Sequence, residues 1–474
     1  MTDPVTDDRA VGHRAYAGPP QEPLPAVPLD AARGEIRALT GLRFFAALYV
    51  IAFHFQFTRG DAYARILEPF QPLIESGALG VDLFFVLSGF VIAHVYARTL
   101  GPGPRARAVG SFLWARFSRI WPVYALVTIG FGLWLLVRAH FDKDGIITVQ
   151  ALQPSLGWRS WVAQLLMVQL WNRPVFHGAS FSGPSWSISA EWLAYVAFPV
   201  LILFAWRLRH GRPGILAFLA LIPLLPQVWI AALPADPPFM WAMRIAGGFS
   251  SGVLIWLAVR RIPPSPRVSR VAAGIAVAAL VEIGLVLGWS SAVGISLDRN
   301  GVRGLAIFAF PVLIGALALS DRGPAAALSH PWAVHGGRIS YSLYLIHLPI
   351  FELYWTAMAN IPAFAPGTAL AAFLSPHVLL LPLVAAHILW RFVEEPARRW
   401  LRTRDPFRHP APAPASLHAR GRRAGRRLRR SRAGWARWRS TVRSDLTYLA
   451  DQPVLGCWSD SFTKNLGPDP ESTR

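Results

Sequence analysis

The stretch "GLRFFAALYVIAFHF", residues 41–55, decides the fold class of this chain. It is almost wholly apolar, and with the residues before it reaches the roughly 20 residues that a helix needs to cross the hydrocarbon core of a bilayer. It nevertheless carries Arg43 near its start and His54 near its end. Ionisable groups inside a membrane are costly and usually serve function. The stretch therefore predicts a membrane helix that contributes to a site.

Windows of the same character recur along the whole chain. The 474 residues are 53% hydrophobic and only 15% charged, which is more apolar than a soluble domain. We predict an all-α, polytopic membrane protein, a bundle of about ten transmembrane helices. The predicted spans are 37–57, 79–97, 118–138, 188–206, 214–232, 240–259, 271–290, 304–320, 339–358 and 369–391.

The basic loops predict the topology. The net charge is +21, and nearly all of the basic residues are Arg. They gather in alternate loops and in the tail, so the positive-inside rule predicts a multi-pass protein of the cell inner (plasma) membrane with both termini cytoplasmic. A basic excess also marks nucleic-acid-binding proteins, but its position between apolar spans favours anionic lipid as the partner of the tail. We expect no nucleic acid.

Composition divides the chain into three parts. We predict a disordered cytoplasmic N-terminal segment (1–35), a transmembrane domain (36–402) and an Arg-rich cytoplasmic tail (403–474). Cys457 is the single cysteine, which excludes an internal disulfide and a cysteine-rich metal site. Since no aspartate-rich motif occurs either, we expect no metal.

Arg43 and His54 lie on one face of the first predicted span. Eleven positions at 1.5 Å and 100° per residue separate them by about 16 Å along the axis and by only about 20° around it. One face thus carries a basic group near the cytoplasm and an imidazole in the outer half. The alternatives are a snorkelling anchor for Arg43 and a packing role for His54.

Two carboxylates match the predicted depth of His54. Asp82 lies near the outer end of the second span, and Glu191 lies near the outer end of the fourth, four residues after Ser187. Either carboxylate is suited to orient the imidazole and to stabilise its protonated form. Asp82 has an alternative role as an acid at a helix N-terminus. Arg244, in the sixth span, is a buried charge with no evident partner.

Further polar groups follow helical spacing. Arg116 and Arg119 lie three apart at the predicted cytoplasmic mouth of the third span, where they suit either phosphate binding or membrane anchoring. Ser340, Tyr344 and His347 give the ninth span a polar stripe, which either lines a cavity or joins two helices by hydrogen bonds.

The outer loop 139–187 predicts a short amphipathic helix at the interface. Its side chains suit either that interfacial position or stacking on sugars; they are Trp158, Trp161, Trp171, Asn172 and His177.

By themselves, the polar groups of the predicted spans favour chemistry on a phosphate-bearing donor that enters from the arginine side. They are equally compatible with a transporter or flippase of a glycolipid or metabolite, or with a scaffold anchored by the basic tail.

Six stretches together resemble a known family. In order they are "ALTGLRFFAALYVIAFHF", "LGVDLFFVLSGFVIA", "FLWARFSRIWPVY", "PSWSISAEW", "ISYSLYLIHLPIF" and "RFVEEPARRW". They resemble the membrane-bound acyltransferase family 3, the O-antigen acetylase-like acyltransferases, over about residues 36–400. Two departures are visible: the family often has "DGLRG" where this chain has "TGLRF", and Trp192 replaces a second acid after Glu191.

The resemblance implies an acyl-CoA-dependent O-acyltransferase. Such an enzyme transfers an acyl group, most often acetyl from acetyl-CoA, to a hydroxyl of a carbohydrate-containing acceptor such as an envelope polysaccharide or glycolipid. The alternative acceptor is a macrolide or another secondary metabolite. An unrelated type of membrane O-acyltransferase also uses an intramembrane His, but that His lies far along its chain.

The resemblance, together with the polar stripe of the ninth span, gives the roles that we expect of single residues. We expect His54, Asp82 and Glu191 to be catalytic. The expected donor-binding residues are Arg43, Arg116 and Arg119. The expected substrate-binding residues are Trp186, Ser187, Tyr344 and His347.

Overall fold

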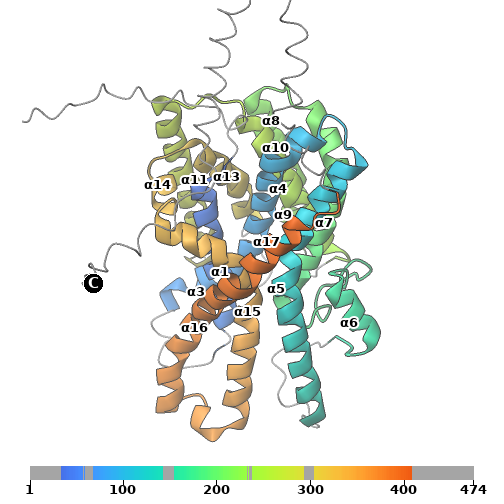
Figure 1. The fold of residues 1–474 in the computed structure, drawn as a ribbon. Coiled ribbons are helices and arrows are strands. Elements are labelled where there is room, and N and C mark those ends of the chain that lie inside the picture. The colour runs from blue at the N-terminus through green and yellow to red at the C-terminus, as the bar shows by residue number, and fades with distance from the viewer. Residues whose placement is uncertain are drawn as a thin grey trace, which may run out of the picture. The chain divides into compact units, whose positions relative to one another are not determined.

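The computed structural model describes residues 34–56, 58, 68–141, 154–231, 233, 237–292 and 304–407. Within these ranges the chain forms helices and no strand (Figure 1). The predicted N-terminal segment up to residue 33 lies outside the described residues, and so does the Arg-rich tail from residue 408, to which we assigned anionic lipid.

All ten predicted spans fall on helices, which confirms the all-α, multi-pass class. The helices are α1 (Arg37–Phe55), α4 (Leu79–Leu100), α5 (Ala106–Phe141), α7 (Trp186–Arg207), α8 (Pro213–Leu219) with α9 (Leu225–Ala231), α10 (Met240–Val259), α11 (Pro266–Ala292), α13 (Ala309–Leu319), α15 (Pro331–Asn360) and α16 (Ala369–Leu389).

Eight helical stretches of the described chain are long and apolar enough to cross a membrane. Two predicted spans are not among them. The stretch Ala306–Leu319, which contains α13, is too short. Helix α15 is long, but its polar stripe lowers its mean hydropathy. The count of eight is therefore lower than the predicted ten because one span is short and another carries polar groups.

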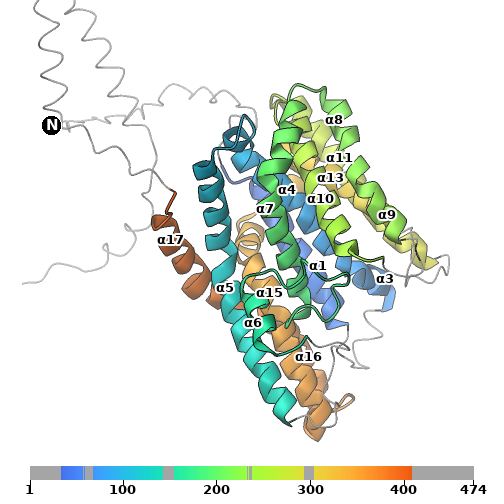
Figure 2. The ribbon, with the colours of Figure 1, turned by 90° about the vertical axis from the view of Figure 1, so that its right-hand side faces the viewer.

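Four further helices are short. They are α3 (Gln71–Glu75), α6 (Trp158–Leu165), α14 (Pro324–Leu328) and α17 (Glu395–Thr403), which follows a π-helical turn (Trp390–Glu394). Helix α6 is the short helix predicted in the outer loop, and it lies beside the long α5 (Figure 2). Its Trp158 is exposed, whereas Trp161 packs against Phe181.

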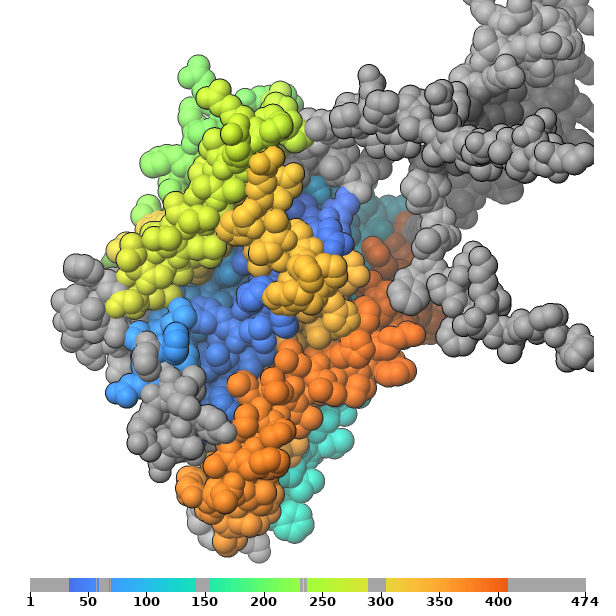
Figure 3. Space-filling model, turned by 90° about the vertical axis from the view of Figure 1, so that its left-hand side faces the viewer, coloured from blue at the N-terminus to red at the C-terminus, as the bar shows by residue number. Residues whose placement is uncertain are grey.

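The centre of the bundle consists of α1 and α4 with their partners α15 and α10. Glycines allow these backbones to touch. A Cβ atom at Gly89 of α4 would lie 2.0 Å from the carbonyl oxygen of Phe249 in α10, and one at Gly337 of α15 would lie 1.8 Å from that of Thr40 in α1. Such close approach is typical of helix pairs in membranes. Part of α1 reaches the surface between α11 and α16 (Figure 3).

We expect Gly89→Ala to destabilise the bundle, because its methyl group meets a backbone carbonyl that cannot rotate away. The loss should be about 1–3 kcal/mol, measured as a lower midpoint of thermal unfolding in detergent. Gly130→Ala is the control, since Gly130 is exposed on α5 with no atom near its Cβ position, and Ala favours a helix over Gly. Equal midpoints for the two variants would contradict the close contact.

Candidate functional site

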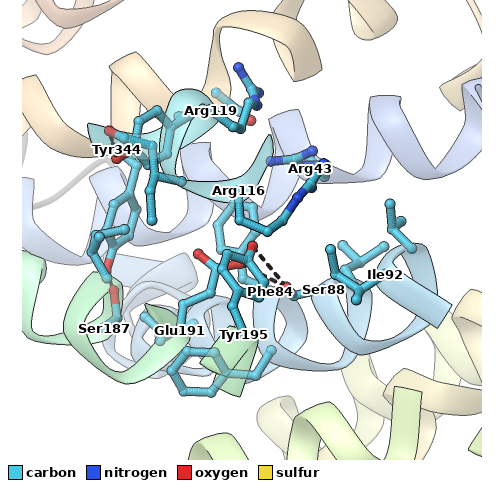
Figure 4. Close-up of a pocket in the computed structure, with 18 residues that line it drawn as sticks. Arg43, Phe84, Ser88, Ile92, Arg116, Arg119, Ser187, Glu191, Tyr195 and Tyr344 are labelled. Carbon is cyan, nitrogen blue, oxygen red and sulfur yellow. Dashed lines mark hydrogen bonds between the residues drawn. The ribbon is translucent and has the colours of Figure 1, made fainter. Parts of the chain in front are cut away.

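Three arginines gather in one cavity inside the bundle. This arginine cavity has a volume of about 100 Å³, and its walls come from α1, α4, α5, α7 and α15. Arg43, Arg116 and Arg119 line it together with Glu191. Figure 4 shows the three guanidinium groups gathered on one side of the cavity. The sequence-predicted donor-binding residues are thus brought together, although they come from two helices.

The three guanidinium groups differ in how well they are paired. Arg119 forms an ion pair with the buried Glu394 of the π-helical turn. Arg116 donates through Nη2 to the Tyr96 hydroxyl at 3.0 Å, but its buried Nε has no hydrogen-bond partner in the described chain. Arg43 has neither an ion pair nor a hydrogen bond to any described residue. Buried donors without partners mark a place where a ligand is expected.

Glu191 belongs to the arginine cavity rather than to His54. Its Oε1 accepts hydrogen bonds from the Ser88 hydroxyl at 2.7 Å and from the Tyr195 hydroxyl at 2.5 Å. The structure therefore does not match the expectation that Glu191 orients His54. The two residues have a similar depth along their helices, but depth alone does not determine which neighbour a side chain faces.

His54 lines a second cavity. This histidine cavity has a volume of about 410 Å³ and is also lined by Trp186, His177 and Arg244. His54 Nδ1 lies 2.9 Å from the Val50 carbonyl oxygen and 3.3 Å from His347 Nε2. A carbonyl oxygen can only accept, so the hydrogen bond to Val50 requires a proton on Nδ1. We therefore assign an unprotonated Nε2 to His54, which is the form that a base requires.

His347 takes the place that we expected a carboxylate to occupy. It is fully buried on α15, and it is the side chain that contacts the His54 ring edge at Nδ1. With the His54 proton shared between Val50 and His347, the ring is held in one orientation. The substrate-binding role predicted for His347 stays a prediction, and the geometry adds a contact that positions His54.

Asp82 is paired with Arg244 and does not reach His54. Its two carboxylate oxygens accept from Arg244 Nε at 2.9 Å and from Nη2 at 2.7 Å, which is bidentate geometry. The Arg244 guanidinium also lies 5.2 Å from the centre of the Trp186 ring. This corrects the expectation that Asp82 orients His54, and it supplies the partner of Arg244 that the sequence did not reveal.

A further buried ion pair escaped sequence reasoning. The Arg138 Nη1 atom of α5 lies 3.2 Å from the Glu352 Oε2 atom of α15, and both side chains are buried. Both lie within predicted spans, so two opposite intramembrane charges were the available signal.

Among the residues that the structure describes, no group of three His, Cys, Asp or Glu side chains is arranged to hold a metal ion.

Tyr344 separates the two cavities. Tyr344 and Val81 line both of them. The Tyr344 hydroxyl lies 2.7 Å from the Ser187 hydroxyl and donates to the Pro184 carbonyl oxygen at 3.0 Å. Figure 4 shows Ser187 next to Tyr344. The arginine cavity and the histidine cavity are therefore neighbours across a thin wall of hydroxyl groups and one apolar side chain.

Comparison with known proteins gives the family. A family model described as an acyltransferase domain matches residues 36–387, so the chain belongs to this family of acyltransferases. The family resemblance read from the sequence is thereby confirmed. No solved structure gives a significant match.

Three relatives indicate the range of the family. Acyltransferase MdmB of Streptomyces mycarofaciens is 28% identical over 410 residues, 81% of this chain and 96% of the relative. Peptidoglycan O-acetyltransferase OatA of Listeria monocytogenes is 24% identical over 403 residues, 77% of this chain and 56% of the relative. Exopolysaccharide production protein ExoZ of Rhizobium meliloti is 28% identical over 319 residues, 63% of this chain and 84% of the relative.

Asp82→Asn should destabilise the protein, because it removes the buried carboxylate charge opposite the partly buried guanidinium of Arg244. Removing one partner of a buried pair typically costs about 3–5 kcal/mol, measured as a lower thermal unfolding midpoint in detergent. The double variant Asp82→Asn with Arg244→Met removes both charges and should recover most of the loss. A single variant with the wild-type midpoint and no activity would instead show that Asp82 takes part in the chemistry.

Proposed function

We propose that the protein is an acyl-CoA-dependent O-acyltransferase. It transfers an acyl group, with acetyl as the first candidate, to a hydroxyl of a carbohydrate-containing acceptor such as an envelope polysaccharide or glycolipid. One observation carries the proposal: an arginine cavity with an unsatisfied Arg116 donor adjoins a histidine cavity lined by His54, and Tyr344 lines both. The relatives named for peptidoglycan O-acetylation and exopolysaccharide production support this acceptor class.

The arginine cavity suits the phosphates of the donor. Arg43 is free of partners among the described residues, and Arg116 keeps a free Nε. Guanidinium groups bind phosphate through paired, charge-assisted hydrogen bonds. Arg119 is already neutralised by Glu394, so we assign the phosphate contacts chiefly to Arg43 and Arg116. We place this cavity on the cytoplasmic side, in keeping with the Arg-rich loops at that end.

His54 would act as the general base. Its Nε2 takes the proton of the acceptor hydroxyl while that oxygen attacks the thioester carbonyl carbon. The C–S bond then breaks, and the proton passes from Nε2 to the departing thiolate. The Nδ1–H bond to the Val50 carbonyl stabilises the imidazolium between these two steps. In a two-step route the same nitrogen would carry the acyl group.

The histidine cavity suits a sugar. Its volume of about 410 Å³ falls within the usual range for small-molecule sites, about 300–1,000 Å³. Trp186, Trp355 and Phe176 line it, and their flat apolar rings complement the faces of sugar rings. His177 and Arg244 add polar groups that suit hydroxyls. We place this cavity on the outer side of the plasma membrane, where envelope glycans are found.

The test is transfer of label from donor to acceptor. The purified protein is incubated in detergent with labelled acetyl-CoA and fractionated envelope glycans, and each fraction is assayed for ester-linked label. Label in a glycan fraction that is released by mild base supports the proposal. If no fraction gains label while free CoA also fails to accumulate, the proposed function is wrong.

His54→Gln should lower transfer by about 10²–10⁴-fold, the usual contribution of a general base. The control is His377→Gln on α16, because His377 makes the same ring-to-carbonyl bond four residues back but is exposed on the surface. Initial rates of CoA release by both variants check this, with gel filtration to confirm that each is folded. Near-normal turnover by a folded His54→Gln protein would rule out the assigned role.

Arg43→Gln should weaken donor binding, since it removes a guanidinium that has no other partner in the described chain. A hydrogen bond to a charged group contributes about 1.5–3 kcal/mol, so KM for acetyl-CoA should rise about 10- to 100-fold with a smaller effect on kcat. Arg267→Gln is the control, because Arg267 is exposed at the start of α11 and lines neither the arginine cavity nor the histidine cavity. A loss confined to kcat would argue against donor binding.

A further inference from the structure

A third cavity lies between the start of α5, the end of α4 and α17. This α17 cavity has a volume of about 460 Å³. Its lining residues are Tyr96, Ser111, Trp114, Ala115, Arg402 and Asp405. None of them lines the arginine cavity or the histidine cavity, so this is a separate space that the proposed reaction does not yet use.

The α17 cavity adjoins the arginine cavity. Tyr96 lines the first and Arg116 lines the second, and Arg116 Nη2 donates to the Tyr96 hydroxyl at 3.0 Å. The Arg116 guanidinium also lies 5.1 Å from the centre of the Tyr96 ring. The Arg116–Tyr96 contact therefore lies where the two cavities adjoin.

The walls of the α17 cavity are fixed by hydrogen bonds between helices. The Trp114 indole donates to the Leu401 carbonyl oxygen at 2.8 Å, which joins α5 to α17. The Ser111 hydroxyl donates to Asp405 at 2.6 Å, and the other oxygen of that carboxylate accepts from the Phe407 N–H at 2.9 Å. Two hydrogen bonds thus join α5 to α17 and the residues that follow it, and the cavity is a built feature of the fold.

The lining combines the groups that recognise a nucleotide. Trp114 and Tyr96 offer aromatic rings against which a base can pack. Arg402 is exposed, and it has no ion pair or hydrogen bond to any described residue, so its guanidinium is available for a phosphate. Asp405 is the one acid in the lining. It repels a phosphate but accepts hydrogen bonds from a ribose hydroxyl or an exocyclic amino group.

The sizes of the arginine cavity and the α17 cavity indicate how a nucleotide-bearing acyl donor would divide between them. The arginine cavity, at about 100 Å³, lies below the usual range of roughly 300–1,000 Å³ for small-molecule sites. It has room for a narrow chain and a phosphate but not for a nucleoside. The α17 cavity, at about 460 Å³, lies within that range.

We infer that the α17 cavity binds the nucleotide end of the acyl donor, with the adenine between Trp114 and Tyr96 and the ribose phosphate at Arg402. The inference rests on the proposed function for the identity of the donor. The donor then runs from the α17 cavity past Arg116 into the arginine cavity, and its acyl end reaches Tyr344. The residues of α17 select a nucleotide-bearing donor over a shorter thioester.

The first test compares a full donor with a truncated one. Arg402→Gln should raise KM for acetyl-CoA about tenfold or more, the loss expected for one charge-assisted contact, and should leave KM for acetyl-pantetheine unchanged. Arg399→Gln is the matched control, because Arg399 is an exposed arginine of the same helix that pairs with Glu395 and does not line the cavity. A change in KM for both donors, or for neither, overturns the inference.

The second test needs no turnover. Binding of adenosine 3′,5′-bisphosphate to the purified, full-length protein is measured by calorimetry in detergent. Wild-type and Arg399→Glu proteins should bind it, and Arg402→Glu should bind at least tenfold more weakly. Absence of binding by folded wild-type protein, or equal binding by Arg402→Glu, overturns the inference. A wild-type protein that binds the nucleotide but transfers no acyl group overturns only the proposed function.

Discussion

The structure depends on the pairing of charges within an apolar bundle. An isolated ion in such surroundings is strongly disfavoured, so each buried charge needs an opposite charge close by. Within the described residues, three such ion pairs join helices that are distant in sequence. They are Arg244–Asp82 between α10 and α4, Arg138–Glu352 between α5 and α15, and Arg119–Glu394 between α5 and the π-helical turn. Two of the pairs hold a cavity-lining side chain in place, Arg119 in the arginine cavity and Arg244 in the histidine cavity.

The candidate site is recognised by the polar groups that this pairing leaves out. Arg43, the Nε of Arg116 and our assigned Nε2 of His54 have no hydrogen-bond partner in the described chain. Together with Arg402, they follow one another from the α17 cavity through the arginine cavity to the histidine cavity. Proteins tolerate unsatisfied polar groups where a ligand completes them, so this order suits an elongated molecule that reaches the wall at Tyr344, with His54 on the other side of that wall.

The sequence predicted the fold class and the two basic groups of α1 correctly. It did not predict which side chains these and other buried polar groups contact. Apolar windows and 3.6-residue spacing are local properties, so they predicted the spans and the shared face of Arg43 and His54. The depth of Asp82 along its span is also a local property, and it led us to expect a contact between Asp82 and His54. Which helices surround a side chain is set by the packing of the whole bundle, and packing instead brought Arg244 to Asp82 and His347 to His54.

The wall at Tyr344 has a consequence for the membrane itself. A bilayer stores energy as an ion gradient only while it conducts no protons, and a continuous file of water through a protein would discharge that gradient. The Tyr344 hydroxyl is held by Ser187 and Pro184, and Val81 lies beside it. Because these hydroxyls are already hydrogen-bonded within the protein and Val81 is apolar, the wall interrupts a continuous row of water molecules between the two cavities. The bundle can therefore hold polar space on both sides and still insulate.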